Sequence, residues 1–394
     1  MRIVYVTSRF PFPVEKGDKL RAFHQIRILS KRHEIHLVAI SHKSISQEAL
    51  DAMRPYCKSV RVFRIREWLL PFQILSGWLE GLPLQVSYFL DRTIKRQVQY
   101  HIIHIEPDHV ICQLIRAAGY VRALPFQKTL DYMDVFSEGM HQLAVQHKRF
   151  SFFFEMEARR LAAYERTIYK DFDHHIIISA QDRERLKMPS KDQISVIPNG
   201  VDTKYWHNTG PHTASHDLVF VGNLGYGPNK STASFIVKNI LPALLKRKRK
   251  VKLLIAGARP GHEVSAFSTI EGVTVKGWVE DIREAYQDGR IFVAPMFSGL
   301  GLQNKILEAM SMRLPCVTSS MVNNAIGAMP GKHILVADNI DDIVNCIELL
   351  LDHPDRYEEI ANAGREYVEA HFNWDDQVNK LEKLIFTQNE YLPK

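Results

Sequence analysis

Residues 291–320 read IFVAPMFSGLGLQNKILEAMSMRLPCVTSS, and this stretch decides the predicted fold. An apolar run typical of a strand, IFVAP (291–295), comes first, and a second such run, PCVTSS (315–320), comes last. Between them, residues 303–312 carry apolar side chains at helical spacing. Two strands joined by a helix in this way lie parallel in one sheet, so the stretch predicts a βαβ unit.

The same alternation of short apolar runs and helical patterns continues on both sides of this unit. Further strands are predicted at residues 2–6, 34–40, 108–114, 126–132, 174–179, 217–223, 252–258 and 273–278. Further helices are predicted at residues 19–31, 140–170, 229–247, 280–288, 340–352 and 355–371. Strands that alternate with helices imply parallel sheets covered on both faces, and right-handed crossovers make such sheets doubly wound.

The chain is long enough for two domains. Its 394 residues exceed what one ordinary core holds, and the strand–helix pattern breaks near Pro198 and Gly200. We therefore predict an α/β protein of two Rossmann-like, doubly wound parallel-sheet domains, residues 1–200 and 201–374. Ligands of such sheets bind beyond the carboxyl ends of the strands, and we expect these ends of both domains to face one cleft.

Charge is distributed unevenly between the two predicted domains. Residues 1–200 carry a net charge of +9, and residues 201–394 carry a net charge of −2. A basic first half predicts an anionic partner, either a phospholipid surface or a phosphorylated substrate. The sequence has no zinc finger, RNP-like aromatic motif or base-reading basic helix, so a nucleic acid is not a predicted partner.

The sequence predicts a cytoplasmic protein. Its four cysteines have no paired or CxxC spacing, which fits free thiols in a reducing compartment. The start, MRIVYVTSRFPFP, holds too short an apolar run for a signal peptide, and no segment is expected to span a membrane. The apolar region 68–90 fits either helices packed inside the first domain or an aromatic-rich surface. The second interpretation would place the protein peripherally at the inner face of the plasma membrane.

The loop after the strand 291–295 is the first candidate site. Gly299 and Gly301 lack a Cβ and let the backbone approach a ligand, and the helix that is expected to begin near Leu302 directs its positive end at this loop. Lys305 adds a cation, and Glu308 shares its helix face and can accept hydrogen bonds from a vicinal diol such as a ribose. The alternative is an ordinary lysine–glutamate pair on the protein surface.

An ordered set of segments resembles the group 1 glycosyltransferases, family 4 of the retaining enzymes with the two-domain GT-B architecture. Gly299, Gly301, Lys305 and LEAMSMRLPCVTSS resemble the family signature, in which a glutamate, seven residues and a second glutamate precede Ala-Met-Ala-x-Gly-x-Pro-Val-Val; that second glutamate matches Glu308. Other family segments are IPNGVD (197–202), FVGNLGYGPNK (220–230), IAGARP (255–260), VKGWVEDIREAY (275–286) and HFNWDDQVNKLEKL (371–384). The spacing G-x-G-x-x-x-K-x-x-E is similar to family branches linked to exopolysaccharide export.

The resemblance implies that the second domain binds a nucleotide-diphosphate sugar as co-substrate, with no metal and no other cofactor. The implied donor contacts are Gly17, Asn223, Lys230, Trp278, Val279, Gly299, Leu300, Gly301, Leu302, Lys305 and Glu308. Among them, Lys305 and Glu308 are assigned catalytic roles, on the leaving diphosphate and on the ribose. Leu300 replaces the first family glutamate and Asn223 replaces a family basic residue, so two side-chain contacts are missing.

The resemblance also assigns roles in the first domain. Candidate contacts with an anionic acceptor follow the first strand and are Lys16, Lys19, Arg21 and His24. A polar loop that only caps a helix is the alternative. Asp131 and Asp134 lie where relatives place a His or Asp near the reacting sugar, and we favour Asp134 as catalytic over a turn aspartate. The C-terminal helix, residues 375–394, is expected to pack back on this domain, as it does in relatives.

The implied function is transfer of a sugar to a glycan or lipid-linked acceptor, with retention of configuration, in surface polysaccharide biosynthesis. A sugar-nucleotide 2-epimerase of the same fold and a non-catalytic sugar-nucleotide-binding protein remain alternatives. The D-x-D pattern at residues 171–173 and the two histidines after it precede a strand, the wrong end for a catalytic metal site, so no metal site is predicted. The basic run 246–250 also precedes a strand and is interpreted as a solvated turn rather than a membrane-binding patch.

Overall fold

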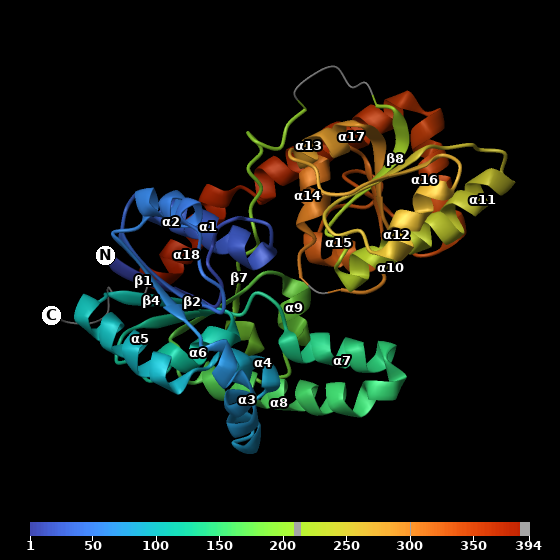
Figure 1. Ribbon diagram of the computed structural model, residues 1–394. Helices are drawn as coiled ribbons and strands as arrows, with labels where there is room; N and C mark the ends of the chain where they lie inside the picture. Colours follow the sequence, from blue (N-terminus) through green and yellow to red (C-terminus); the bar gives the residue numbers. More distant parts are fainter. Residues whose placement is uncertain (209–213, 300, 387–394) are drawn as a thin grey trace. The chain divides into compact units, whose positions relative to one another are not determined.

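The computed structural model describes residues 1–208, 214–299 and 301–386, which belong to two compact units (Figure 1). Unit 1 comprises Met1–Asn199 and Trp374–Lys394, and unit 2 comprises Gly200–Asn373. Each unit contains one sheet in which all neighbouring strands are parallel. The predicted fold class, an α/β protein with two doubly wound parallel sheets, is confirmed.

The sheet of unit 1 has seven strands in the order β3-β2-β1-β4-β5-β6-β7. Their bounds are β1 Arg2–Thr7, β2 Glu34–Ser41, β3 Ser59–Arg64, β4 His109–Gln113, β5 Lys128–Asp131, β6 His174–Ile177 and β7 Ser195–Val196. The chain winds outward from β1 to β3 and then resumes at β4 on the other side of β1. The order therefore reverses between β1 and β4, where such sheets open a crevice for ligands.

Helices cover both faces of this sheet. They are α1 Gly17–Leu29, α2 Gln47–Met53, α3 Leu70–Leu79, α4 Leu84–Phe89, α5 Arg92–Ile105, α6 Ile115–Val121, α7 Phe136–Gln146, α8 Ser151–Tyr169, α9 Ala180–Arg185 and α18 Trp374–Phe386. Alternate residues of β1 supply the two cores: Val4 and Val6 pack with α4, α5, α6 and α8, whereas Ile3 and Tyr5 pack with α1, α2 and α18. Both faces of the strand are buried, as expected for a parallel sheet.

The prediction of one helix over residues 140–170 was wrong. The segment forms two antiparallel helices, α7 and α8, which lie side by side in green in Figure 1. Contacts between them pair His141 with Glu155 at 2.9 Å, and the hydroxyl of Ser137 donates to the carboxylate of Glu165 at 2.7 Å. The turn falls at residues 147–150, where no Gly or Pro marks it in the sequence.

The C-terminal helix α18 packs against α1 of unit 1. The indole of Trp374 stacks on the imidazole of His24, with 4.6 Å between the ring centres. Further along the helix, Glu382 accepts a hydrogen bond from the ring of His33 at 2.6 Å and pairs with Arg32 at 2.5 Å. The last segment of the chain therefore completes the core of the unit that contains the N-terminus.

The sheet of unit 2 has six strands in the order β10-β9-β8-β11-β12-β13. Their bounds are β8 His216–Val221, β9 Leu253–Ala256, β10 Val273–Lys276, β11 Gly289–Ala294, β12 Cys316–Thr318 and β13 Leu335–Val336. The helices are α10 Gly227–Phe235, α11 Leu241–Lys246, α12 His262–Ser265, α13 Ile282–Gln287, α14 Asn304–Ser311, α15 Ser320–Ile326, α16 Ile340–Asp352 and α17 Pro354–His371. The order reverses between β8 and β11, which makes their carboxyl ends the expected ligand edge.

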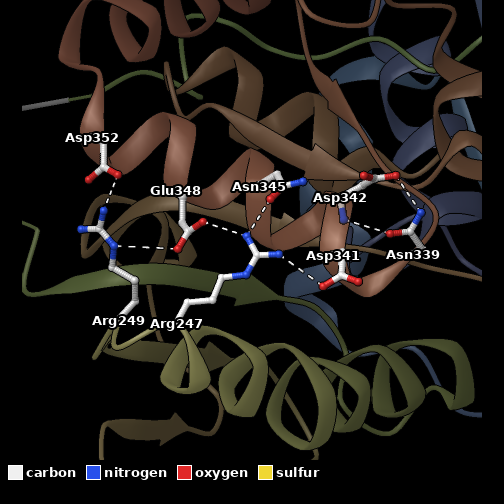
Figure 2. Close-up of polar contacts among 8 residues, drawn as sticks. All are labelled: Arg247, Arg249, Asn339, Asp341, Asp342, Asn345, Glu348 and Asp352. Atoms are coloured by element: carbon white, nitrogen blue, oxygen red, sulfur yellow. Dashed lines mark hydrogen bonds and ion pairs between the residues drawn. The ribbon is translucent and has the colours of Figure 1, made fainter.

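Two arginines of the basic run 246–250 bind side chains of α16 within unit 2 (Figure 2). The guanidinium of Arg247 donates to Asn345 at 2.6 Å and to Glu348 at 3.0 Å, both on α16. Arg249 binds Asp352 at the end of the same helix and lies 3.8 Å from Glu348. Two of the cations therefore tie the end of α11 to α16, whereas Lys246, Lys248 and Lys250 are exposed, as expected of a solvated turn.

Within the described parts of the chain, none of the helices combines the length and the apolar character that a transmembrane span requires.

Candidate functional site

Two loops meet at the reversal point of the unit 2 sheet. Residues 222–226 connect β8 to α10, and residues 295–303 connect β11 to α14. Because β8 and β11 are parallel neighbours, both loops leave the carboxyl edge of the sheet next to each other. This is the edge at which the sequence places the predicted donor site.

Lys305 lies in the first turn of α14 and links the two loops. Its ammonium donates to the Oδ1 atom of Asn229 on α10 at 2.7 Å and to the Oε1 atom of Gln303 at 3.0 Å. Asn229 is buried and its amide donates in turn to the carbonyl of Asn223 at 3.0 Å. A chain of hydrogen bonds thus holds the lysine between the end of β8 and the start of α14.

The ammonium of Lys305 has few charged neighbours. Burial lowers the pKa of Lys305 to about 8, while the nearby carboxylate of Glu308 acts in the opposite direction. Its hydrogen-bond partners Asn229 and Gln303 are neutral amides. A cation that is poorly solvated and held by neutral groups favours an anionic ligand such as a diphosphate.

Glu308 lies one helical turn further along α14, and Tyr286 of α13 orients it. The hydroxyl of Tyr286 donates to the Oε2 atom of Glu308 at 2.9 Å. Burial raises the pKa of Glu308 to about 7, and the bond from Tyr286 and the charge of Lys305 lower it. Tyr286 was missed as a site residue, because in the sequence it is only the last apolar residue of the helix pattern at 280–288.

The loop before α14 requires glycine at two positions. Gly299 has a φ of +130° and Gly301 a φ of +72°, both in the region that favours glycine. No atom comes closer than 3.8 Å to the position of a Cβ at Gly299, so space remains beside this backbone. Leu302 is buried, and α14 begins at Asn304, two residues later than expected. Leu300 lies outside the described residues.

The other predicted donor contacts of unit 2 share this edge of the sheet. Asn223 is exposed and its Oδ1 atom accepts the N–H of Gly225 at 3.0 Å, while Lys230 is half-buried on α10. Trp278 and Val279 follow β10, two strands away from β8, and the indole is exposed. These residues therefore lie at the same sheet edge as the Lys305 loop.

Unit 1 contains one predicted donor contact, Gly17, and the four predicted acceptor residues, which fall into two groups. Gly17 begins α1 with open space beside it, Lys16 is exposed before it, and Lys19 is half-buried. These three lie near the reversal point of the unit 1 sheet, where β1 and β4 are neighbours, because α1 follows β1.

The second group, Arg21 and His24, departs from the prediction. Arg21 is fully buried, forms an ion pair with Asp131 at 2.5 Å and donates to the carbonyl of Ile197 at 2.8 Å. His24 is covered by the indole of Trp374. Arg21 therefore holds unit 1 together and is not accessible to a substrate, whereas His24 is half-buried and has one ring face covered. Helical periodicity could have indicated this for Arg21, since Ala22, Gln25 and Ile26 of the same turns are also buried.

Asp134 lies between β5 and α7 and fits the favoured acidic role better than Asp131. Asp131 is fully buried in an ion pair with Arg21, whereas Asp134 is only half-buried. Burial raises the pKa of Asp134 to about 7, with further contributions from the carboxylates of Asp182 and Asp18 and an opposing one from Arg116. A carboxyl group with a pKa near neutrality is suited to proton transfer.

The D-x-D pattern lies at the opposite end of the unit 1 sheet. Asp171 pairs with Arg122 at 2.6 Å, and Asp173 accepts the backbone N–H of Lys128 at 2.8 Å. Both aspartates precede β6 and have structural partners there.

The chain matches known families in both units. Residues 215–353 match Glycosyl transferases group 1, and residues 19–205 match Glycosyltransferase Family 4. It is 24% identical over 365 residues to an uncharacterized 44.6 kDa protein in the cps region of Klebsiella pneumoniae, covering 86% of this chain and 88% of that one.

Solved structures show the same fold. Sucrose-phosphate synthase from Thermosynechococcus elongatus superposes with a TM-score of 0.72 at 16% identity, covering 100% of both chains. Anabaena HepE in complex with UDP-glucose superposes with a TM-score of 0.68 at 13% identity, covering 98% of this chain and 100% of the other. The two family matches span most of both parallel-sheet units. The chain therefore belongs to the group 1 glycosyltransferases, family 4 enzymes of GT-B architecture.

Proposed function

We propose that this glycosyltransferase moves a sugar from a nucleotide-diphosphate sugar to a glycan or lipid-linked acceptor in surface polysaccharide biosynthesis. The observation that carries the proposal is the position of Lys305, held 2.7 Å from Asn229 at the sheet reversal point, with Glu308 one turn away. The relative from a cps region supports the polysaccharide assignment. HepE, which binds UDP-glucose, makes a uridine-diphosphate sugar the first donor to test.

The proposed chemistry uses charges of the chain itself to stabilise the leaving diphosphate. Lys305, Lys230 and the positive end of α14 would offset the negative charge that grows on the diphosphate as the glycosidic bond breaks. No metal ion is required in this scheme. Glu308, oriented by Tyr286, would accept hydrogen bonds from the ribose hydroxyls, which fixes the donor relative to these cations.

Unit 1 would supply the acceptor. Lys16 and Lys19 would bind an anionic acceptor beside Gly17, and Asp134 would lie near the reacting sugar, where its raised pKa suits proton exchange with the acceptor hydroxyl. Retention of the anomeric configuration is part of the proposal because the family resemblance implies it. Peripheral binding to an anionic membrane at the inner face of the plasma membrane is also proposed, on the basis of the +9 charge of residues 1–200.

Thermal-shift screening against UDP-, GDP- and ADP-sugars tests donor binding. We expect one nucleotide class to raise the melting temperature, and the shift to disappear in Glu308→Ala. Glu280→Ala, which removes an exposed glutamate on the β10–α13 loop, is the matched control and should keep the shift. If no sugar nucleotide shifts the wild-type protein, the proposed donor site is wrong.

A second measurement separates the alternatives. The protein is incubated with the bound donor alone, and the products are identified by NMR. Conversion of the sugar to its 2-epimer without any acceptor would indicate the epimerase alternative. Donor binding with no hydrolysis, and no transfer to any lipid or glycan extract, would indicate a non-catalytic binding protein. Slow hydrolysis that Glu308→Ala abolishes would support the transferase.

A further inference from the structure

An open cationic cavity lies in unit 1 among α5, α6, α8 and the turn between α3 and α4. Its volume is about 470 Å³. Four cations, Arg92, Lys95, Arg96 and Arg122, line it together with one carboxylate, Glu80. Arg122 pairs with Asp171 just before β6, so the cavity reaches toward the amino end of the sheet and is distinct from the ligand edge.

The charges that line this cavity are only partly neutralised. Glu80 pairs with Arg92, and Asp171 pairs with Arg122. Within the described ranges of the chain, Lys95 and Arg96 have no ion-pair partner, although both lie on the face of α5 that borders the cavity. The cavity is therefore electropositive and attracts an anionic group.

The hydroxyl of a largely buried tyrosine opens onto the same space. Tyr164 of α8 lines the cavity, is 6% exposed, and its hydroxyl has no hydrogen-bond partner among the residues that the structure describes. Gly119 lies opposite: a Cβ there would come within 3.0 Å of Leu90 and 3.7 Å of the Tyr164 hydroxyl. The absence of a side chain at position 119 keeps the space open, and an acceptor oxygen of a ligand would satisfy the hydroxyl.

A second cavity adjoins the cationic one. It has an apolar side formed by Leu69, Phe72, Leu82 and Leu90, and polar residues that include Glu80 and Asp91 line the rest. Its volume is about 230 Å³, and both cavities share Glu80, Leu82, Leu90 and Arg92. Phe72 of α3 lines it and is 70% exposed, and the neighbouring Trp68, Leu75 and Leu79 are exposed as well. One side of residues 68–79 packs on the domain through Leu70 and Gly77, and the other side is exposed, which favours the interpretation of region 68–90 as an aromatic-rich surface. A cationic pocket beside a cavity with an apolar side matches a ligand with an anionic head and a hydrocarbon tail.

We propose that these adjoining cavities bind an anionic phospholipid of the membrane surface. The phosphate would lie between Lys95, Arg96 and the Tyr164 hydroxyl, and the acyl chains would pack against Phe72 and the exposed side of α3. The inference deepens the membrane part of the proposed function and rests on it, but it requires neither the donor site nor any particular acceptor.

Flotation of the full chain with vesicles tests the proposal. We expect binding to vesicles of phosphatidylcholine with phosphatidylglycerol and little binding to phosphatidylcholine alone. The double variant Lys95→Glu/Arg96→Glu should weaken binding roughly tenfold or more, since each cation near an anionic surface contributes strongly. Tyr164→Phe, which keeps the ring and its packing, should weaken it about fivefold. The matched reversal Lys246→Glu/Lys248→Glu, on exposed residues of unit 2, should change it by less than about twofold.

Three outcomes would overturn the proposal. Equal loss in both double variants would show that charge alone drives binding without a cavity. Unchanged binding in the Lys95→Glu/Arg96→Glu variant would place the membrane contact elsewhere. Saturable binding of inorganic phosphate, lost in Tyr164→Phe, without any vesicle binding would assign the cavity to a soluble phosphorylated ligand. The sugar-nucleotide thermal shift should be intact in the cavity variants, so failure of this site and failure of the donor site are distinguishable.

Discussion

Replacement of Lys305 with alanine is expected to lower kcat/KM for sugar transfer by about 100-fold or more. The ammonium is the cation that links the β8 and β11 loops, and its partners there are neutral amides that could not replace its charge. In the proposed mechanism its interaction with the diphosphate strengthens as the bond between sugar and diphosphate breaks, so the loss should fall on kcat as well as on donor binding. The measurement is steady-state transfer kinetics with the donor found by thermal shift.

The pH dependence of kcat/KM distinguishes a lysine that binds the diphosphate from a lysine with only a structural role. Burial lowers the pKa of Lys305 to about 8, and only the protonated form attracts the diphosphate. Wild-type kcat/KM, which reports the free enzyme, should therefore fall as the pH rises through about 8, and Lys305→Ala should lose this limb. Lys248→Ala on the exposed run should behave as wild type. A Lys305→Ala variant with nearly full activity would contradict the assignment.

Replacement of Arg21 with alanine is expected to destabilise unit 1 by about 3–5 kcal/mol. Arg21 and Asp131 are both fully buried, 2.5 Å apart, and the variant would leave Asp131 buried without its counter-ion. The same guanidinium also donates to the carbonyl of Ile197 and to Asn199, so β7 and the end of unit 1 lose their anchor as well. Urea unfolding would measure the loss, and hydrogen exchange in the β4 and β5 peptides would locate it.

Arg9→Ala is the matched control for this prediction. Arg9 also pairs with an aspartate, Asp18 at 2.8 Å, but its side chain is 36% exposed. A partly solvated pair of this kind contributes about 0–1 kcal/mol, so Arg9→Ala should unfold almost as the wild type does. Arg21→Lys should rescue little, because an ammonium cannot make the three bonds of the guanidinium. A loss below about 1 kcal/mol in Arg21→Ala would show that the pair is not structural.

The central strands of both sheets were predictable because parallel strands are buried on both faces and appear as continuous apolar runs. The missed strands are the ones that lack this signature. β3 is an edge strand in which Arg61 and Arg64 are exposed, and β7 and β13 have only two residues each. Charged edge strands and two-residue strands have no periodic apolar pattern, so the sequence does not predict them.

The backbone features of the loop before α14 were predictable because glycines mark them, whereas its role in donor binding stays a prediction. Gly299 and Gly301 adopt positive φ values that few other residues tolerate, and Lys305 and Glu308 follow at helical spacing. The partners of Arg21 and His24 were not predictable from the sequence. Both are polar residues of the predicted helix 19–31, and helical periodicity gave a signal only for Arg21. Their partners, Asp131 and Trp374, lie more than 100 residues away in the sequence, so the sequence does not pair them. The turn between α7 and α8 was not predicted because no Gly or Pro marks it in the sequence.

The structure of the protein with bound UDP-glucose tests the central claim most directly, which is that the start of α14 holds the diphosphate and Glu308 holds the ribose. We expect the ammonium of Lys305 at hydrogen-bond distance, about 2.7–3.2 Å, from a diphosphate oxygen. The carboxylate of Glu308 should accept bonds from the ribose hydroxyls while Tyr286 still donates to it. A nucleotide bound away from the loop 295–303, or a ribose that other residues hold while Glu308 keeps only Tyr286, would contradict the account.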